Sequence, residues 1–127
     1  MRVKTGNTYS MPHELLPCGN GTSYVPGQGL YISSGVAALA TGTNKPTHIC
    51  QEKKTGVTGE AVMAVRVTPD MTLEATLAAD GTALAVGSAV TIHTDGIQLT
   101  ATTTSGVATI VDFPEGKASG AKVLFKL

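Results

Sequence analysis

Alternating apolar and polar residues predict two β-strands. Over 71–77 the apolar residues stand at every second position, whereas a helix would space them three or four apart. We therefore expect a strand there, with Thr72, Glu74 and Thr76 facing water. The segment 122–127 alternates in the same way, which predicts a last strand with its apolar face inward.

Glycine-containing dipeptides predict the turns between strands. Asp95-Gly96 lies between two short apolar runs and is the strongest hairpin signal, because this dipeptide readily adopts the positive φ angles of a type I′ turn. Ser34-Gly35 stands at the comparable place of an earlier hairpin, and Asp80-Gly81 is a third candidate turn. Turns at such regular intervals between short strands favour an all-β fold, either a sandwich or a small closed β-barrel.

The chain also resembles itself at a distance of about 60 residues. Gly27 and Gly87, which are 60 positions apart, each precede an apolar run and a turn. Ile49 aligns with Ile110 at a distance of 61.

Each half of this repeat ends in a strand, with 63–67 over 123–127 at a distance of 60. An internal duplication with halves 27–67 and 87–127 is one interpretation. The other is that small β proteins share such patterns without being duplicated.

Residues 1–17 do not show this pattern of alternating apolar positions and regular turns. They hold two prolines and few alternating residues, and their apolar anchor is formed by Met11, Leu15 and Leu16. We predict an extended N-terminal arm over 1–17 that packs on a neighbouring subunit. A single β-rich domain follows over 18–127.

Composition narrows the classes of function. Charged residues make up 14% of the chain, nine basic against nine acidic, so the clustered basic face that nucleic acids and anionic membranes require is not expected. No segment has the roughly 20 apolar residues of a membrane-spanning helix. There is no Trp, with two Phe and three Tyr, which argues against an aromatic-lined sugar site.

The two cysteines, Cys18 and Cys50, are too few for a disulfide framework. The first residues also lack the apolar stretch of a secretory signal. We therefore expect free thiols and a reducing compartment, such as a host cytoplasm in which a virus assembles.

Candidate catalytic and metal-binding residues are sparse. His93 lies near Asp95, but the two flank a turn, and no nucleophile, base and acid stand in a recognisable arrangement. A zinc site of His13, Cys18, His48 and Cys50 matches no known spacing. We expect His48 and Cys50 to face outward from their strand. The prediction is a non-enzymatic protein without metal or cofactor.

The second half of the chain carries a resemblance. A glycine and apolar strand over 87–92, the Asp95-Gly96 turn, the strand that starts Gly106-Val107-Ala108 and the final strand after Gly120 resemble the head decoration, or cement, proteins of tailed phages. The resemblance covers residues 25–127.

This resemblance implies a small β-barrel or β-tulip body, with an extended arm, bound to the outside of a capsid. It implies a virion structural protein that is assembled in the host cytoplasm, partners the major capsid protein and forms a homotrimer. The predicted contacts with capsid or subunit are Arg2, Lys4, Met11, Pro12, Leu15 and Leu16. Alternatives are a head-fibre, spike or tail-tube domain, or a carbohydrate-binding β-sandwich.

Overall fold

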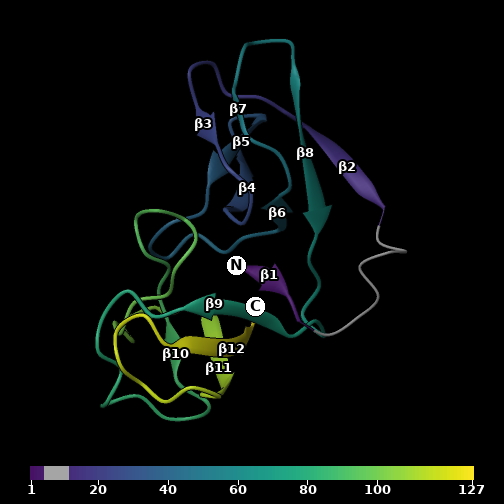
Figure 1. Cartoon of the computed structure of the whole chain (residues 1–127). Helices are drawn as coiled ribbons and strands as arrows, with labels where there is room; N and C mark the ends of the chain where they lie inside the picture. Colours follow the sequence, from purple (N-terminus) through teal and green to yellow (C-terminus); the bar gives the residue numbers. More distant parts are fainter. Residues whose placement is uncertain (5–11) are drawn as a thin grey trace.

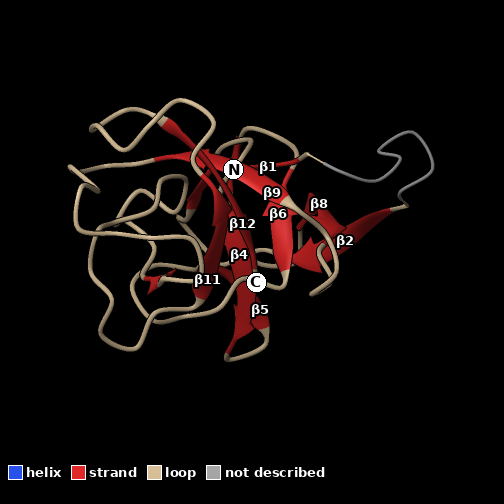
Figure 2. Cartoon of the chain, turned by 90° about the horizontal axis from the view of Figure 1, so that it is seen from below, coloured by secondary structure: helices blue, strands red, loops and turns tan. Residues whose placement is uncertain are grey.

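The computed structural model describes residues 1–4 and 12–127. These residues form antiparallel sheets, and no helix is present among them (Figure 2). The predicted all-β class is thereby confirmed. The sheets curl around their own cores without closing into barrels, so the arrangement is sandwich-like. Within the described ranges there is no helix long and apolar enough to cross a membrane.

The first sheet is built from the N-terminal half of the chain. Its strands, in order across the sheet, are β2 (His13–Pro17), β8 (Ala61–Arg66), β6 (His48–Cys50), β4 (Gly29–Ser33) and β5 (Val36–Leu39). Tyr24, Leu30 and Val62 are buried in its core. A parallel bridge between Cys18 and Ala37 brings its first and last strands together. The short strands β3 (Ser23–Tyr24) and β7 (Lys54–Thr55) form a separate pair beside it.

The second sheet is built mainly from the C-terminal half. Its strands, in order, are β1 (Arg2–Val3), β9 (Leu73–Thr76), β12 (Lys122–Lys126), β11 (Ala108–Asp112) and β10 (Ala89–Val90). Leu73, Val90 and Phe125 lie in its core. Figure 1 shows β2 to β8 above, β9 to β12 below, and β1 with both chain termini between them.

Four strands of one sheet correspond to four strands of the other. The neighbour order β2-β8-β6-β4 in the first matches β9-β12-β11-β10 in the second, and every pair is antiparallel. Next to these strands, Ile32 pairs with Ala37 in the first sheet, and Ile92 with Leu99 in the second. The chain therefore contains two units of one topology, which we name the first unit (12–67) and the second unit (72–127).

Backbone hydrogen bonds repeat as well. The Gly27 N–H donates to Cys50 O at 3.0 Å, and 60 positions later the Gly87 N–H donates to Ile110 O at 2.8 Å. In return, the amides of Cys50 and Ile110 donate to the carbonyls one residue after each glycine, at 2.8 and 2.9 Å. Both glycines have positive φ, +92° and +95°, which explains why glycine stands at each position. These bonds support the duplication interpretation.

The register of the repeat differs from the prediction. Cys50, and not Ile49, corresponds to Ile110. A shift of one residue moves every side chain of a strand to the other face. Accordingly, His48 and Cys50 are buried inside the first unit, at 3% and 0% exposure, and Ile49 packs against the core of the second unit. The prediction that His48 and Cys50 face outward was wrong.

The predicted N-terminal arm is also corrected where the structure describes it. Arg2–Val3 pairs with β9 and His13–Pro17 pairs with β8, so residues 1–4 and 12–17 belong to the body. The strand pattern of β2 was missed because its partner lies more than 40 residues away along the chain. The repeated units begin at β2 and β9, earlier than the predicted halves. Residues 5–11, with Met11, lie outside the described residues.

The sequence predicted a type I′ turn most strongly at Asp95-Gly96, but the structure has the positive φ angles of that turn at Ser34-Gly35 instead. Ser34 and Gly35 both have positive φ, +50° and +80°, as a type I′ turn requires. At Asp95-Gly96 only the glycine does. The Asp95 carboxylate instead accepts hydrogen bonds from the backbone N–H groups of residues 97 and 98, at 2.9 and 3.0 Å. Asp95 thus shapes a wider loop.

Both thiols are free and buried, and we expect them to be unreactive in the folded protein. Burial raises the pKa of Cys50, which lowers the thiolate fraction that reacts. Alkylation without reductant should modify neither Cys18 nor Cys50 in native protein and both after denaturation. Mass spectrometry checks this. A two-dalton deficit that resists alkylation in denaturant would reveal a disulfide instead.

Candidate interaction surface

Strand β2 lies at an edge of the first sheet, on the outer right side in Figure 1. The Cys18 N–H donates to Glu60 O at 3.0 Å. Because antiparallel partners alternate between bonded and non-bonded pairs, Leu16 bonds to β8 while the backbone groups of Leu15 and His13 point away from it. Among the described residues, these outward groups have no partner. An edge of this kind can pair with another strand.

The side chain of Leu15 marks the same edge. It is 69% exposed, the largest exposure among the large apolar side chains of the described residues. Leu16, its neighbour, is 7% exposed and packs in the core of the first unit. Consecutive strand residues face opposite sides, so the predicted contact set is divided. Leu15 and the exposed Pro12 lie on the surface, and Leu16 stabilises the fold.

The predicted contact residues Arg2 and Lys4 hold β1 onto the second unit. The Arg2 guanidinium lies 2.7 Å from a Glu74 carboxylate oxygen, and Lys4 Nζ lies 3.4 Å from the other. The Glu74 side chain is 8% exposed. The sequence predicted that Glu74 faces water, which was wrong because β1 covers it. That cover comes from a segment 70 positions earlier, which no local pattern reveals.

Glu74 gives the fold a pH dependence. Burial alone would raise the pKa of its carboxyl, but hydrogen bonds from Arg2 and Lys4 outweigh burial and hold the pKa below its ordinary 4.5. A depressed carboxyl pKa stabilises the folded state above the unfolded value, and this contribution is lost as pH falls through the folded value.

We expect Glu74→Gln to lower the free energy of unfolding by about 1 kcal/mol at pH 7, since the two cations remain solvated. The difference from the wild type should shrink as pH falls below 4.5. Urea unfolding at several pH values measures both. Glu115→Gln, at an exposed ion pair of 3.9 Å with Lys122, is the matched control and should change little. An equal loss at pH 3 and pH 7 would contradict the ion-pair explanation.

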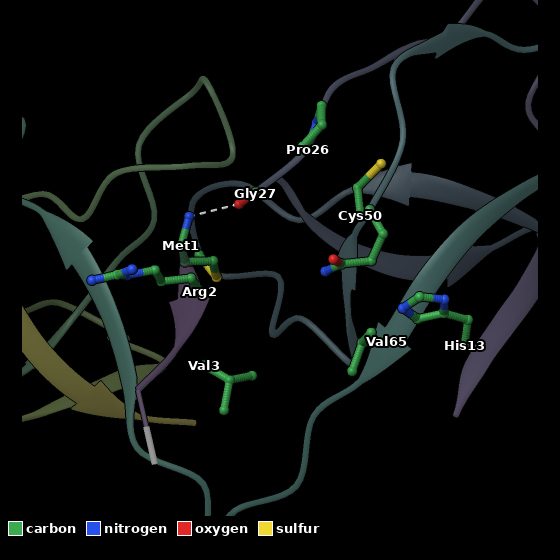
Figure 3. A pocket seen from close by; sticks show the side chains of 9 residues that line it. Met1, Arg2, Val3, His13, Pro26, Gly27, Cys50 and Val65 are labelled. Atoms are coloured by element: carbon green, nitrogen blue, oxygen red, sulfur yellow. Dashed lines mark hydrogen bonds between the residues drawn. The ribbon is translucent and has the colours of Figure 1, made fainter. Parts of the chain in front are cut away.

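A groove of about 490 Å³ separates β1 from the first sheet. Figure 3 shows Met1, Arg2 and Val3 on one side, with Cys50, Val65 and His13 across from them. The Met1 amino group donates to Gly27 O at 2.7 Å and fixes the start of β1 at the end of this groove. The lining mixes aliphatic side chains with the polar side chains of Arg2, His13 and Gln51.

A polar row, which the sequence did not predict, crosses the first unit. The Thr47 hydroxyl lies 2.8 Å from His48 Nδ1, and His48 Nε2 lies 3.3 Å from a Glu14 carboxylate oxygen. His48 Nε2 is buried and makes no hydrogen bond. Arg66 binds Glu14 through two hydrogen bonds, of 2.9 and 3.0 Å.

This row contains a hydroxyl, an imidazole and a carboxylate, as a hydrolytic triad does. Its contacts, however, indicate a structural role. The bidentate Arg66 contact lowers the pKa of Glu14 more than the neighbouring imidazole does. The Glu14 carboxylate is therefore ionised and bound to the Arg66 guanidinium. Glu14, His48 and Arg66 come from β2, β6 and β8, so the row ties three neighbouring strands together. No sequence signal pointed to it, because its members meet only through sheet pairing.

The zinc arrangement that the sequence raised is not assembled in the described part of the chain. Within it, no group of three or more His, Cys, Asp or Glu side chains lies close enough to hold a metal ion. Cys18 and Cys50 share the apolar core of the first unit, whereas the exposed His13 lines the groove opposite β1.

No protein-family model matches the chain, and no curated protein sequence matches it. The class that the fold defines is an all-β protein made of two like units, in which β2 is an edge strand with no partner on its outer side among residues 1–4 and 12–127.

Proposed function

We propose that this chain is a virion structural protein that binds the outer surface of a phage capsid and stabilises the shell. Its partner is the major capsid protein, and copies associate as a homotrimer on the capsid exterior. The protein acts by binding and has no catalytic role.

The observation that carries the proposal is the β2 edge, open among the described residues, with its exposed Leu15, on a body of two β units. A protein that reinforces a shell needs a surface that adds backbone hydrogen bonds and apolar contacts to a neighbour, repeated at many copies. The resemblance of residues 25–127 to phage cement proteins supports the same conclusion. The balanced charge of nine basic and nine acidic residues agrees with a protein partner rather than nucleic acid.

A gene-deleted phage tests the proposal. We expect its particles to lack this protein, to release DNA at a lower temperature than wild-type virions, and to regain wild-type stability when purified protein is added. Sedimentation of particles with added protein, followed by a thermal release assay, measures binding and stabilisation together. Particles that bind none of the protein and are as heat-stable as the wild type would refute the proposal.

A further inference from the structure

The internal repeat shows what an edge like that of β2 accepts. In the second unit, β9 is the counterpart of β2, and its outer edge is occupied by β1. In the first unit the corresponding edge is open among the described residues. Strands β2 and β9 align residue by residue.

Three observations fix that alignment. The Leu77 N–H donates to Ala121 O at 3.0 Å, as the Cys18 N–H does to Glu60 O. Leu77 also forms a parallel bridge, with Leu99, as Cys18 does with Ala37.

The core pairs agree as well. Leu16 stands opposite Val62 in the first sheet, and Ala75 stands opposite Val123 at the matching place of the second. The first strands of the two units are thus 59 positions apart, and the last strands 61, one more than the sequence predicted. In this alignment Leu15 corresponds to Glu74 and His13 corresponds to Thr72.

The backbone of the second unit is paired at these two positions. Arg2 stands opposite Glu74, and the Lys4 N–H donates to Thr72 O at 2.8 Å. The outward backbone groups of Leu15 and His13 therefore occupy the places that β1 fills in the other unit. In the part of the chain that the structure describes, the first unit presents the same ladder positions with no strand paired to them.

The side chains along this edge indicate what kind of strand could pair with β2. In the second unit, the acidic Glu74 is covered by the basic Arg2 of β1 and by Lys4, which follows β1. In the first unit the corresponding side chain is the apolar, 69% exposed Leu15. A complementary strand therefore carries an uncharged apolar residue over Leu15 in place of those two cations.

We infer that the β2 edge binds an extended, apolar segment of the capsid shell protein, which adds to the first sheet as an antiparallel strand in the way that β1 adds to the second. This inference rests on the proposed function and names the surface that performs it.

A second copy of this chain is a poorer occupant. If two β2 strands paired about Leu15, His13 of each would face Pro17 of the other, and proline has no N–H to donate. If they paired one residue off, the two Glu14 carboxylates would stand directly opposite one another, which is unfavourable. The protein's own β1 is already paired with β9.

Hydrogen–deuterium exchange with particles of the gene-deleted phage tests the inference. We expect the amides of His13 and Leu15 to exchange rapidly in the free protein and at least tenfold more slowly on the particles. Leu15→Asp should weaken particle binding at least tenfold. His13→Pro should do the same, because it removes an outward N–H and leaves the bonds to β8 intact. Val86→Asp, at a side chain 65% exposed in the second unit, is the control and should bind normally.

The outcomes separate the two proposals. If wild-type protein binds the particles while both β2 variants bind equally well, the inference is wrong and the proposed function stands. If wild-type protein does not bind at all, the proposed function and this inference both fail. Protection of the His13 and Leu15 amides in free, self-associated protein would identify a second copy as the occupant and overturn the shell-protein assignment.

Discussion

Gly106→Ala should destabilise the protein by about 3 kcal/mol and lower its melting temperature by about 10 °C. The turn at Gly106 passes so close to β10 that an added Cβ would overlap the carbonyl of Ala89 and lie 2.5 Å from the nitrogen of Val90. Both obstacles are backbone atoms in a paired strand, so neither can rotate away. Relief requires the turn to separate from β10, which would break the 2.9 Å bond from the Val107 N–H to Val90 O.

Thermal and urea unfolding measure this effect, and a second glycine provides the control. Gly116 has φ of +88°, and a Cβ there would meet nothing within 4 Å. Gly116→Ala should therefore cost only the backbone strain, about 1 kcal/mol. If the two alanine variants were equally stable, the close approach of the turn to β10 would be contradicted.

Tyr24→Leu should lower the free energy of unfolding by about 3–5 kcal/mol. Tyr24 is fully buried, and its hydroxyl accepts the Gly19 N–H at 2.8 Å and donates to Ala37 O at 2.7 Å. These bonds join the turn after β2 to β5, where the first sheet curls back on itself. Leucine stands at the matching place of the second unit, Leu84, so the substitution installs the residue that the repeat itself uses.

The loss has two parts, which separate variants resolve. Tyr24→Phe keeps the ring and removes the hydroxyl, so it should cost about 1–3 kcal/mol for the two unpaired backbone groups. The remainder in Tyr24→Leu reports the cavity. Tyr31→Phe, at a half-buried position on β4, should change little. Full stability of Tyr24→Phe would show that the hydroxyl bonds do not hold the sheet edges together.

The sequence was informative wherever structure follows from nearby residues. The period-two pattern over 71–77 and 122–127 lies on β9 and β12, and the repeat at about 60 residues corresponds to two units of one topology. Positive φ at Gly27 and Gly87 explains why the glycines were the clearest markers of that repeat. Apolar periodicity and turn glycines are local signals, and both were sufficient for the fold class.

What the sequence could not predict depends on pairing between distant segments. The strand over 13–17 has one apolar residue on its inner face and an exposed one beside it, so it showed no alternation. Its assignment to the first sheet needs β8, and the burial of Glu74 needs β1. For the same reason the sequence could not tell which side chains of the predicted contact set are exposed: Leu15 lies on the surface and Leu16 in the core. Their contact with a capsid stays a prediction.

A one-residue error in aligning the repeats had larger consequences than its size suggests. Placing Ile49 over Ile110 exchanged the two faces of β6 and left His48 and Cys50 in water, whereas both are buried. The alternating geometry of a strand converts any such shift into a reversal of inside and outside. Only the hydrogen bonds of Cys50 and Ile110 with the glycine turns settle the alignment.

Cryo-electron microscopy of wild-type and gene-deleted virions tests the central claim most directly. We predict density for a two-unit β body on the outer surface of the wild-type capsid, around three-fold positions, with β2 toward the shell and a strand of the capsid protein beside Leu15. This density should be absent from the gene-deleted particles. Identical capsid surfaces in the two preparations, or density for this chain in the tail, would contradict the account.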